Sequence, residues 1–475
     1  MSEKDKIKRI EIRENGLDIA FRIWESGEVE LVRLGAVDAC HEDLPPSGET
    51  DGDIKVLHPV VSAQISGRSS GNFHGYTHRA GSETSRFAYK KHTLSRNDQG
   101  TLLVMDLISS SGLEAFYHMQ LFDGVPAVRT WTVLENTSER SMTLEYVTSF
   151  MFDGISAGGR RPFYEKTDIY IPYSGWCSEG RWKKEDCRDL GLTGMPIHGH
   201  NTASRSHYRY KYGVCGSWSS CDYLPMGITR DRETGEMTFF EIEHSGSWEA
   251  EYGYGAGKTL YLALLGPSDE SLWWKDLAPG ESFTTVPASF GAVMGDVSET
   301  LAALTRLRRR IRTANCSEKA GQCSLIFNDY MNCLFGDPTE EKEKAIIDIA
   351  ADLGCEYYCI DAGWYDKGYW WDRVGEWKES RERFPSGLRS LVEYGRAKGL
   401  KMGLWLEIEV MGTACPLADE LPDSWFIMHH GKRRTDNARY LLDFRNPQVR
   451  DYCTGVIDRL VEEAGAQFFK IDYNV

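Results

Sequence analysis

The pattern of apolar and polar positions divides the chain into two parts. Up to about residue 295, short runs rich in β-branched and aromatic residues alternate with Gly, Asn, Asp and Ser. Such runs predict strands, and the clearest of them are 28–37, 101–108, 127–136, 142–152 and 259–266. Many strands without long helical patterns predict a large antiparallel β-sandwich. We expect the Gly-, Ser-, Tyr- and Arg-rich stretch 155–235 to form long loops from it.

The periodicity changes to that of a helix over residues 296–315, where leucines and an isoleucine recur at helical spacing: Leu301, Leu304, Leu307 and Ile311. We therefore assign residues 1–295 to the β-sandwich, 296–318 to a linker helix and 319–475 to a second domain. The basic run Arg306–Arg312 falls on this helix, where we expect it to be a solvated face and not a nucleic-acid site.

Strands and helices alternate after the linker. The run 324–329 predicts a strand, and Asp337 followed by Pro338 predicts the start of a helix. Its expected apolar face is Ile346, Ile349, Ala350 and Leu353. A later helix is predicted to begin at Asn446-Pro447, with an apolar side made of Val449, Cys453, Val456 and Leu460.

Three times a helix pattern runs into a glycine and then into a mostly apolar strand; the glycines are Gly354, Gly399 and Gly465. Each strand ends on carboxylates, which are Asp361, then Glu407 with Glu409, then Asp472. This order predicts a (β/α)₈ TIM barrel, of which four strands, about the first half, lie in the chain. A doubly wound sheet is the alternative, but no G-x-G-x-x-G follows a strand.

Carboxylates on one rim could serve acid–base chemistry, covalent catalysis or metal binding. Aromatic residues follow the first of them, and Trp405 precedes Glu407. Flat rings suit the apolar face of a sugar and carboxylates accept its hydroxyl hydrogens, so we predict a carbohydrate site. The aromatic residues concerned are Trp364, Tyr365, Tyr369, Trp370, Trp371, Trp377 and Trp405.

Several of these residues also have a structural interpretation. Trp370 and Trp371 could pack a loop, Glu409 and Asp443 could be structural acids, and Lys470 could form an ion pair with a neighbouring carboxylate. For Asp472 we favour a functional role over a structural one, because it combines a strand-end position with an adjacent lysine that would keep it ionised.

Composition narrows the function classes. A net charge of -16 argues against a nucleic-acid partner, and no apolar run is long enough to span a membrane. The charged N-terminus does not look like a signal peptide, and the 12 cysteines are scattered, so we expect a cytoplasmic protein with free thiols. His198 and His200, like the pair Cys215 and Cys221, lack further ligands at metal spacing, so we expect no metal.

The motifs together resemble a known family. "IDAGWY", "GEW…FPSGL", "GLKMGLWLEIEVM", "YLLDFRNPQVRDY" and "FFKIDYN" look like successive barrel signatures of glycoside hydrolase family 36, the α-galactosidases and α-N-acetylgalactosaminidase-like enzymes. The N-terminal half is similar to that family's β-supersandwich. The resemblance implies an exo-acting, retaining glycosidase without a cofactor, which forms a covalent glycosyl-aspartate and releases terminal α-linked galactose.

The resemblance also implies residue roles. Asp472 matches the nucleophile, and the acid/base residue would lie beyond residue 475, so we expect a fragment of a longer enzyme. Residues that match sugar-binding positions or rings of the site are Asp361, Trp364, Trp405, Lys470 and Asn474, whereas Arg439 is near an expected arginine but shifted. The family's D-D-G-W is D-A-G-W here, and Tyr330 stands near an expected tryptophan. Because Ala362 removes a hydroxyl partner, a 2-amino or 2-acetamido galactoside is a credible substrate.

Two other hypotheses stay open at this point. Lys470 could be the Schiff-base amine of a barrel aldolase, since it lies on the same strand face as Asp472. The protein could also bind carbohydrate without turnover. As partners we expect an α-galactoside oligosaccharide or glycoconjugate and further copies of the chain, with a tetramer suggested by the resemblance.

Overall fold

A computed structural model describes residues 8–45, 58–70, 76–193, 209–255, 259–315 and 324–474, with the side chains of 313–315 left out. The chain forms two compact units, Met1–Cys316 and Ser317–Val475. Among the described residues, no helix has the length and apolar character needed to cross a membrane.

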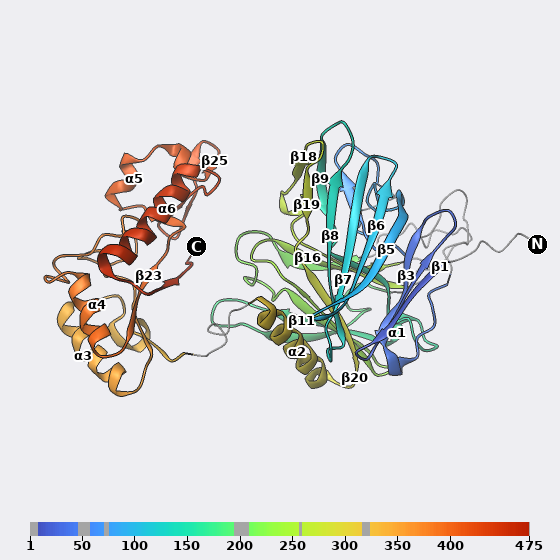
Figure 1. Ribbon diagram of the computed structural model, residues 1–475, viewed down its shortest axis with the longest axis horizontal. Coiled ribbons are helices and arrows are strands. Elements are labelled where there is room, and N and C mark those ends of the chain that lie inside the picture. Colours follow the sequence, from blue (N-terminus) through green and yellow to red (C-terminus); the bar gives the residue numbers. More distant parts are fainter. Residues whose placement is uncertain are drawn as a thin grey trace, which may run out of the picture. The chain divides into compact units, whose positions relative to one another are not determined.

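The first unit consists of antiparallel sheets (Figure 1). The longest has the order β12 (Arg181–Asp186), β11 (Thr167–Tyr173), β14 (Met226–Asp231), β15 (Glu236–Ile242), β20 (Ala288–Met294), β8 (Ala127–Asn136), β7 (Leu113–Leu121), β6 (Gly100–Ser109) and β5 (Phe87–Asn97), with β19 (Ser282–Thr284) beside β8. A four-stranded sheet has the order β10 (Phe150–Ile155), β17 (Leu260–Leu265), β16 (Trp248–Tyr254) and β13 (Arg209–Val214). Two three-stranded sheets are β1 (Lys8–Glu14), β2 (Leu17–Ile23), β3 (Val29–Ala36), and β18 (Lys275–Leu277), β9 (Met142–Val147), β4 (Ala63–Ile65).

Alternation of buried and partly exposed residues explains these strands. In β7 and β8 every second side chain points into a shared apolar core, as the two-residue period of a strand requires. The core contains residues from all four sheets, among them Leu31, Tyr117, Leu144 and Trp248. The strands predicted at the five clearest runs are confirmed, and the multi-sheet β-rich architecture with them.

The prediction of long loops over 155–235 is wrong for the described part of that stretch. It contains helix α1 (Phe163–Lys166) and the strands β11, β12, β13 and β14. Polar and aromatic side chains on partly exposed strands disguised the two-residue period there, as in β12, where no residue is buried.

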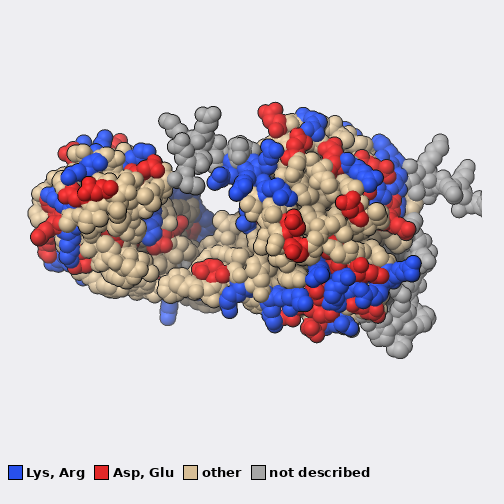
Figure 2. All heavy atoms as spheres, turned by 90° about the horizontal axis from the view of Figure 1, so that it is seen from below, with Lys and Arg blue, Asp and Glu red and all other residues tan. Residues whose placement is uncertain are grey.

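Helix α2 (Val297–Asn315) confirms the helical periodicity. Leu304 and Leu307 are buried against strands of the first unit, whereas Leu301 is 38% exposed. The basic run lies on the exposed face, where Arg308 pairs with Glu241 at 2.8 Å, as expected of a solvated face. Figure 2 shows Lys and Arg side chains in several groups, with Asp and Glu side chains beside many of them.

The second unit contains a parallel sheet with the order β21 (Ile326–Asn328), β22 (Tyr357–Ile360), β23 (Lys401–Leu406) and β29 (Phe468–Ile471). The connecting helices are α3 (Glu340–Asp352), α4 (Leu388–Ala397) and α6 (Pro447–Arg459). Helix α3 packs against β22 and α4 against β23 (Figure 1). Between β23 and α6 lie α5 (Pro416–Glu420) and the short strands β24 (Val410–Gly412), β25 (Met428–His429), β26 (Lys432–Arg433), β27 (Thr435–Asp436) and β28 (Arg439–Leu441).

Local signals for these elements are largely confirmed. Gly354, Gly399 and Gly465 all have φ near +80°, the left-handed conformation that ends a helix. At α6, the Asn446 side chain accepts a hydrogen bond from the Gln448 amide and caps the helix, as predicted.

Helix α3 differs from its prediction in its start and in its buried face. The cap is Thr339, two residues after Asp337, whose carboxylate instead pairs with Arg383 at 2.7 Å. The buried residues are Glu343, Ile347 and Ala350, whereas Ile349 is 57% exposed and Leu353 67% exposed. A buried glutamate on this helix was not expected.

Candidate active site

The predicted strand-end acids lie at one edge of the parallel sheet. Asp361 follows β22, Glu407 follows β23 and Asp472 follows β29. The register pairs Ile360 with Leu404 and Leu406 with Ile471, so the three strands end at nearly the same level. The carboxyl ends of parallel strands are where α/β proteins place their sites.

Asp361 is buried and bound on both oxygens. Its Oδ2 accepts from the Lys470 ammonium at 2.8 Å and from the Asn328 amide at 2.6 Å, and its Oδ1 accepts from the Ala362 amide. Burial opposes the charged form of Lys470, but the hydrogen bond to Asp361 and the charges of Asp361 and Asp472 together outweigh burial and raise the pKa of Lys470. Lys470 thus forms an ion pair with a neighbouring carboxylate, as its structural interpretation predicts. The expectation that it keeps Asp472 ionised stays a prediction, because the ammonium contacts the carboxylate two strands away.

Asp472 is half-buried and is held by neutral donors. Its Oδ2 accepts from the Trp405 indole N–H at 2.9 Å and from the Asn474 amide at 3.3 Å, and its Oδ1 accepts from the Tyr473 backbone. Its own amide donates to the Leu406 carbonyl at 2.8 Å, which continues the strand pairing. Asn474 and Trp405, both predicted site residues, thus meet at the predicted nucleophile.

Glu407 forms a fully buried ion pair with Arg439. Their side chains are both 0% exposed, and Nε lies 2.7 Å from Oε2. Burial raises the pKa of Glu407, and the guanidinium opposes that rise. The backbone amide of Asn474 donates to the other Glu407 oxygen at 3.0 Å. Arg439 therefore reaches the same edge as the other site residues through Glu407.

The arginine also has a planar partner. The Arg439 guanidinium lies 4.1 Å from the centroid of the Trp371 ring, and its Nη2 is buried without a hydrogen-bond acceptor among the described residues. Stacking on an aromatic face suits a weakly hydrated guanidinium. No sequence pattern indicates this contact, because Trp371 lies in a loop and Arg439 in a short strand far along the chain.

The rings of Trp364 and Trp405 are buried, and neither has an exposed face in the described chain. Each is 0% exposed. The Trp364 ring N–H donates to the Trp405 carbonyl at 3.0 Å, so Trp364 supports Trp405 from inside the unit. The sugar-binding roles expected of both rings stay predictions; in the described chain the N–H edge of Trp405 reaches a site carboxylate, whereas the ring N–H of Trp364 does not.

We interpret the other two acids predicted at strand ends, Asp443 and Glu409, as structural residues. Asp443 pairs with Arg445 at 2.7 Å, and the hydrogen bonds of that pair lower the pKa of Asp443. Burial raises the pKa of Glu409, whose Oε2 has no donor in the described ranges. Ala362 is 1% exposed and lies in the apolar core of the unit. The effect of this residue on substrate selectivity stays a prediction.

Among the described residues, one group of possible metal ligands lies in the first unit. Ligand atoms of His78, Glu249 and Glu270 come within 4.8 Å of one another. The Lys211 ammonium already lies 3.1 Å from Glu249 and also bonds Glu270, and Arg209 pairs with Glu270 at 2.9 Å. These cations neutralise the carboxylates, so we interpret the group as an ion-pair network. His198 and His200 lie outside the described residues.

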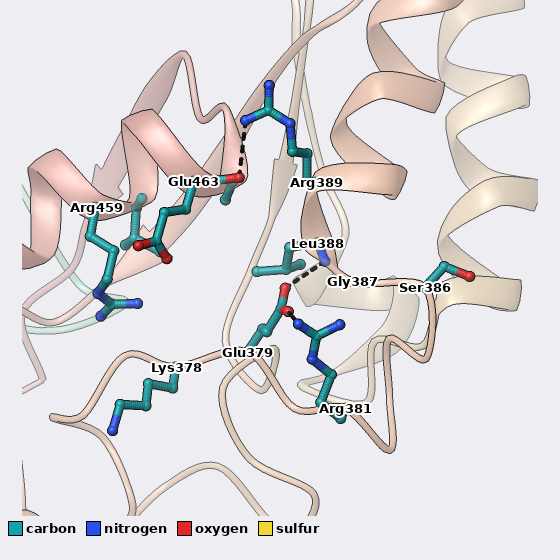
Figure 3. A pocket seen from close by; sticks show the side chains of 11 residues that line it. Lys378, Glu379, Arg381, Ser386, Gly387, Leu388, Arg389, Arg459 and Glu463 are labelled. Carbon is teal, nitrogen blue, oxygen red and sulfur yellow. Dashed lines mark hydrogen bonds and ion pairs between the residues drawn. The ribbon is translucent and has the colours of Figure 1, made fainter.

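A pocket of about 440 Å³ in the second unit contains none of the predicted site residues (Figure 3). Its cations have protein partners: Arg381 pairs with Glu379 at 2.7 Å and Arg389 with Glu393 at 3.1 Å. Glu379 also accepts from the Leu388 amide at the start of α4. Because these charges are already matched, we assign no ligand to this pocket.

Comparison with known proteins gives a family match and several relatives. Residues 285–475 match the melibiase family. The chain is 25% identical over 405 residues to "Probable alpha-galactosidase C" of Aspergillus flavus, which covers 80% of this chain and 49% of that protein. It is 28% identical over 250 residues to "Alpha-galactosidase Mel36A" of Lactobacillus acidophilus, covering 50% of this chain and 32% of that protein.

The fold is likewise similar to solved structures. The GH36 alpha-galactosidase AgaA of Geobacillus stearothermophilus superimposes with a TM-score of 0.77 at 18% identity, covering 98% of this chain and 66% of that one. The family resemblance inferred from the motifs is confirmed by the melibiase match and the α-galactosidase relatives, and the structural likeness shows the fold. The chain spans about half the length of the Aspergillus relative, and less of the Lactobacillus one.

Proposed function

We propose that this chain belongs to a retaining, exo-acting glycoside hydrolase. It would remove a terminal α-linked galactose, or a 2-amino or 2-acetamido derivative, through a covalent intermediate on Asp472. The melibiase match and the α-galactosidase relatives support the reaction class. The site geometry supports the residue that forms the intermediate.

The observation that carries this proposal is which donor contacts each of the three strand-end acids. Asp361 contacts the Lys470 ammonium and Glu407 contacts the Arg439 guanidinium. Asp472 accepts hydrogen bonds from uncharged N–H groups, and no cation contacts it among the described residues. A nucleophile must keep an accessible lone pair, and a carboxylate in direct contact with a cation is less able to supply one.

The proposed reaction uses each residue in one role. Asp472 attacks the anomeric carbon while Trp405 and Asn474 fix its carboxylate through Oδ2. Asp361 and Lys470 bind sugar hydroxyls as acceptor and donor. Retention requires a second carboxyl about 5–5.5 Å from the nucleophile, to protonate the leaving oxygen and then activate water. From the family resemblance we expect this acid/base residue to lie beyond residue 475.

The Lys470–Asp361 contact also bears on the proposal of a barrel. β29 and β22 both flank β23, so the two residues belong to alternate strands. Alternate strands of a flat sheet are about 9.6 Å apart, twice the strand spacing, with their side chains parallel. In a closed barrel, inward side chains of alternate strands meet in one layer. A 2.8 Å contact between such strands is compatible with a (β/α)₈ barrel, but the reach of a lysine side chain also allows it across an open sheet, so the proposal of a barrel rests on the order of strands and helices and on the resemblance.

The aldolase hypothesis is disfavoured by the same ion pair. A Schiff-base lysine must be neutral to attack a carbonyl, which requires a lowered pKa. The pairing with Asp361 and the charge of Asp472 together outweigh burial and raise the pKa of Lys470 instead. The remaining alternative, a carbohydrate-binding protein without turnover, is an outcome of the experiment below.

Substrate and assembly follow from the relatives and the resemblance. Variants of AgaA of Geobacillus stearothermophilus have been solved in complex with raffinose and with stachyose. We propose an α-galactoside oligosaccharide or glycoconjugate as the substrate of this protein, with no cofactor. We further propose a cytoplasmic homo-oligomer, on the strength of the sequence resemblance and the composition.

The test is covalent trapping. A 2-deoxy-2-fluoro α-galactoside should esterify Asp472 in the enzyme that contains this chain, and peptide mapping should locate the sugar there. Asp472→Asn should lower turnover of an aryl α-galactoside by several orders of magnitude with little loss of folding, because covalent catalysis loses its attacking atom. Asp443→Asn is the matched control and should retain activity. A label on Glu407, Glu409 or Asp443 would overturn the assignment, and galactoside binding without release would favour the non-catalytic alternative.

A further inference from the structure

A pair of buried acids lies behind Asp361 and has no part in the proposed reaction. Asp329 follows β21 and is 2% exposed, and Glu343 is on the inner face of α3 and is 0% exposed. Their side chains are near enough to each other to interact. A buried carboxylate normally has a cation nearby, yet these two residues face one another.

Two of the four carboxyl oxygens of Asp329 and Glu343 accept a hydrogen bond from an N–H or O–H group outside the pair. The Tyr358 hydroxyl donates to Glu343 Oε2 at 2.6 Å, and the Asp361 backbone amide donates to Asp329 Oδ1 at 2.8 Å. Within the described chain, no N–H or O–H group reaches the other two oxygens, Asp329 Oδ2 and Glu343 Oε1. Both of these oxygens are buried, and two ionised oxygens in contact would repel each other without solvent screening.

We propose that Glu343 and Asp329 share one proton, and that this shared proton fixes the backbone amide of Asp361. Glu343 holds the proton and donates it to Asp329 Oδ2, which leaves Asp329 Oδ1 to accept the Asp361 amide. The two acids are positioning residues, because they reach the site only through Asp361.

The surroundings of the pair support this protonation. The titratable groups that face it are Tyr358 and Cys359 on β22, Cys333 in the turn after β21, and Asp361 itself. None of these is a cation. Burial, followed by the charge of Asp329, raises the pKa of Glu343 well above its ordinary value, and burial raises the pKa of Asp329 to about 6.

The contacts form one continuous connection from helix α3 to the site. Tyr358 holds Glu343, Glu343 holds Asp329, and Asp329 holds the amide of Asp361. The Asp361 carboxylate then meets Lys470 and Asn328. Loss of the shared proton would bring two buried negative charges together beside the Asp361 amide and would displace it.

Infrared spectroscopy tests the shared proton without any substrate. At pH 7 the difference spectrum between the intact protein and Glu343→Gln should show the carbonyl band of one protonated carboxyl, which the substitution removes; bands of other protonated carboxyls, such as the proposed acid/base residue, are common to both proteins and cancel. Glu341→Gln, the same substitution at an exposed position of α3, is the control and should give no such band in its own difference spectrum. The absence of the band from the Glu343→Gln difference spectrum would overturn the proposal. This arm is independent of the proposed glycosidase function.

A kinetic arm tests positioning, and it rests on the proposed function. Glu343→Leu removes the donor to Asp329 and should raise KM for an aryl α-galactoside about tenfold with a smaller change in kcat. Glu343→Gln should restore KM, because an amide can still donate to Asp329 and accept from Tyr358. It should also abolish the rise of KM at alkaline pH expected of the unsubstituted enzyme. An equal loss of kcat in Leu and Gln variants, with KM unchanged, would show a merely structural role. Total inactivity of every form would count against the proposed function and leave the infrared result to decide on the pair.

Discussion

The buried ion pair between Arg439 and Glu407 should be essential to the stability of the second unit. Arg439→Met keeps an unbranched apolar stem beside Trp371 but removes the charge. Both side chains are 0% exposed, so Glu407 would be left as an uncompensated buried carboxylate. Breaking such a pair costs about 3–5 kcal/mol. That is a large share of the ~5–15 kcal/mol that stabilises an ordinary domain.

Arg445→Met is the matched control. Arg445 also lies 2.7 Å from its acid, Asp443, but its side chain is 86% exposed. An exposed pair of this kind contributes about 0–1 kcal/mol. Hydrogen exchange in increasing urea, followed in peptides of the second unit, separates its unfolding from that of the first unit.

The pH dependence provides the sharper part of this test. Burial raises the pKa of Glu407 in the folded protein, so its charge opposes folding increasingly as pH rises above the pKa of the unfolded chain. Without Arg439 to oppose that rise, the folded pKa should go higher still. The deficit of Arg439→Met should therefore be largest at neutral pH and should shrink as pH falls toward about 4.3, the unfolded value. A deficit below that of Arg445→Met, or one that does not change with pH, would refute this reasoning.

Two further predictions concern the site and the helix ends. Lys470→Met should raise KM for an aryl α-galactoside about tenfold to a hundredfold, because a hydrogen bond with a charged group is worth ~1.5–3 kcal/mol; Lys401→Met, at an exposed position, should not. Gly354→Ala should cost about 1–2 kcal/mol in thermal unfolding, since φ is +78° and no atom lies within 4 Å of the added methyl group, so the cost is that of the backbone alone. An unchanged KM in the first variant, or an unchanged melting temperature in the second, would contradict these predictions.

Much of the fold could be predicted because its signals are local. Strand periodicity, the Asn446 cap and the three glycines each depend on a few adjacent residues, and the structure confirms them. The buried face of helix α3 was predicted wrongly because it contains a glutamate. A pattern search that scores only apolar residues rotates the helix toward Ile349 and Leu353 and so misses Glu343.

The positions of the site residues could be predicted better than their partners. Topology alone brings Asp361, Glu407 and Asp472 to one edge, because parallel strands end there. Which cation meets which acid depends on side-chain length and on contacts between strands that are not neighbours in sequence. Trp364 shows the same limit, since an aromatic residue after a strand can support the site from within as well as face a ligand.

The pairing that the sequence suggested, Lys470 with Asp472, would have weakened the nucleophile that it was meant to sustain. A lysine in contact with the attacking oxygen lowers that oxygen's nucleophilicity as well as its basicity. By reaching across β23 to Asp361, Lys470 instead leaves Asp472 with donors that orient it without neutralising it. The ammonium still acts on Asp472 through space, since that charge contributes to raising the pKa of Lys470. The arrangement thus leaves the proposed nucleophile with hydrogen bonds that orient its carboxylate and with no cation in direct contact among the described residues.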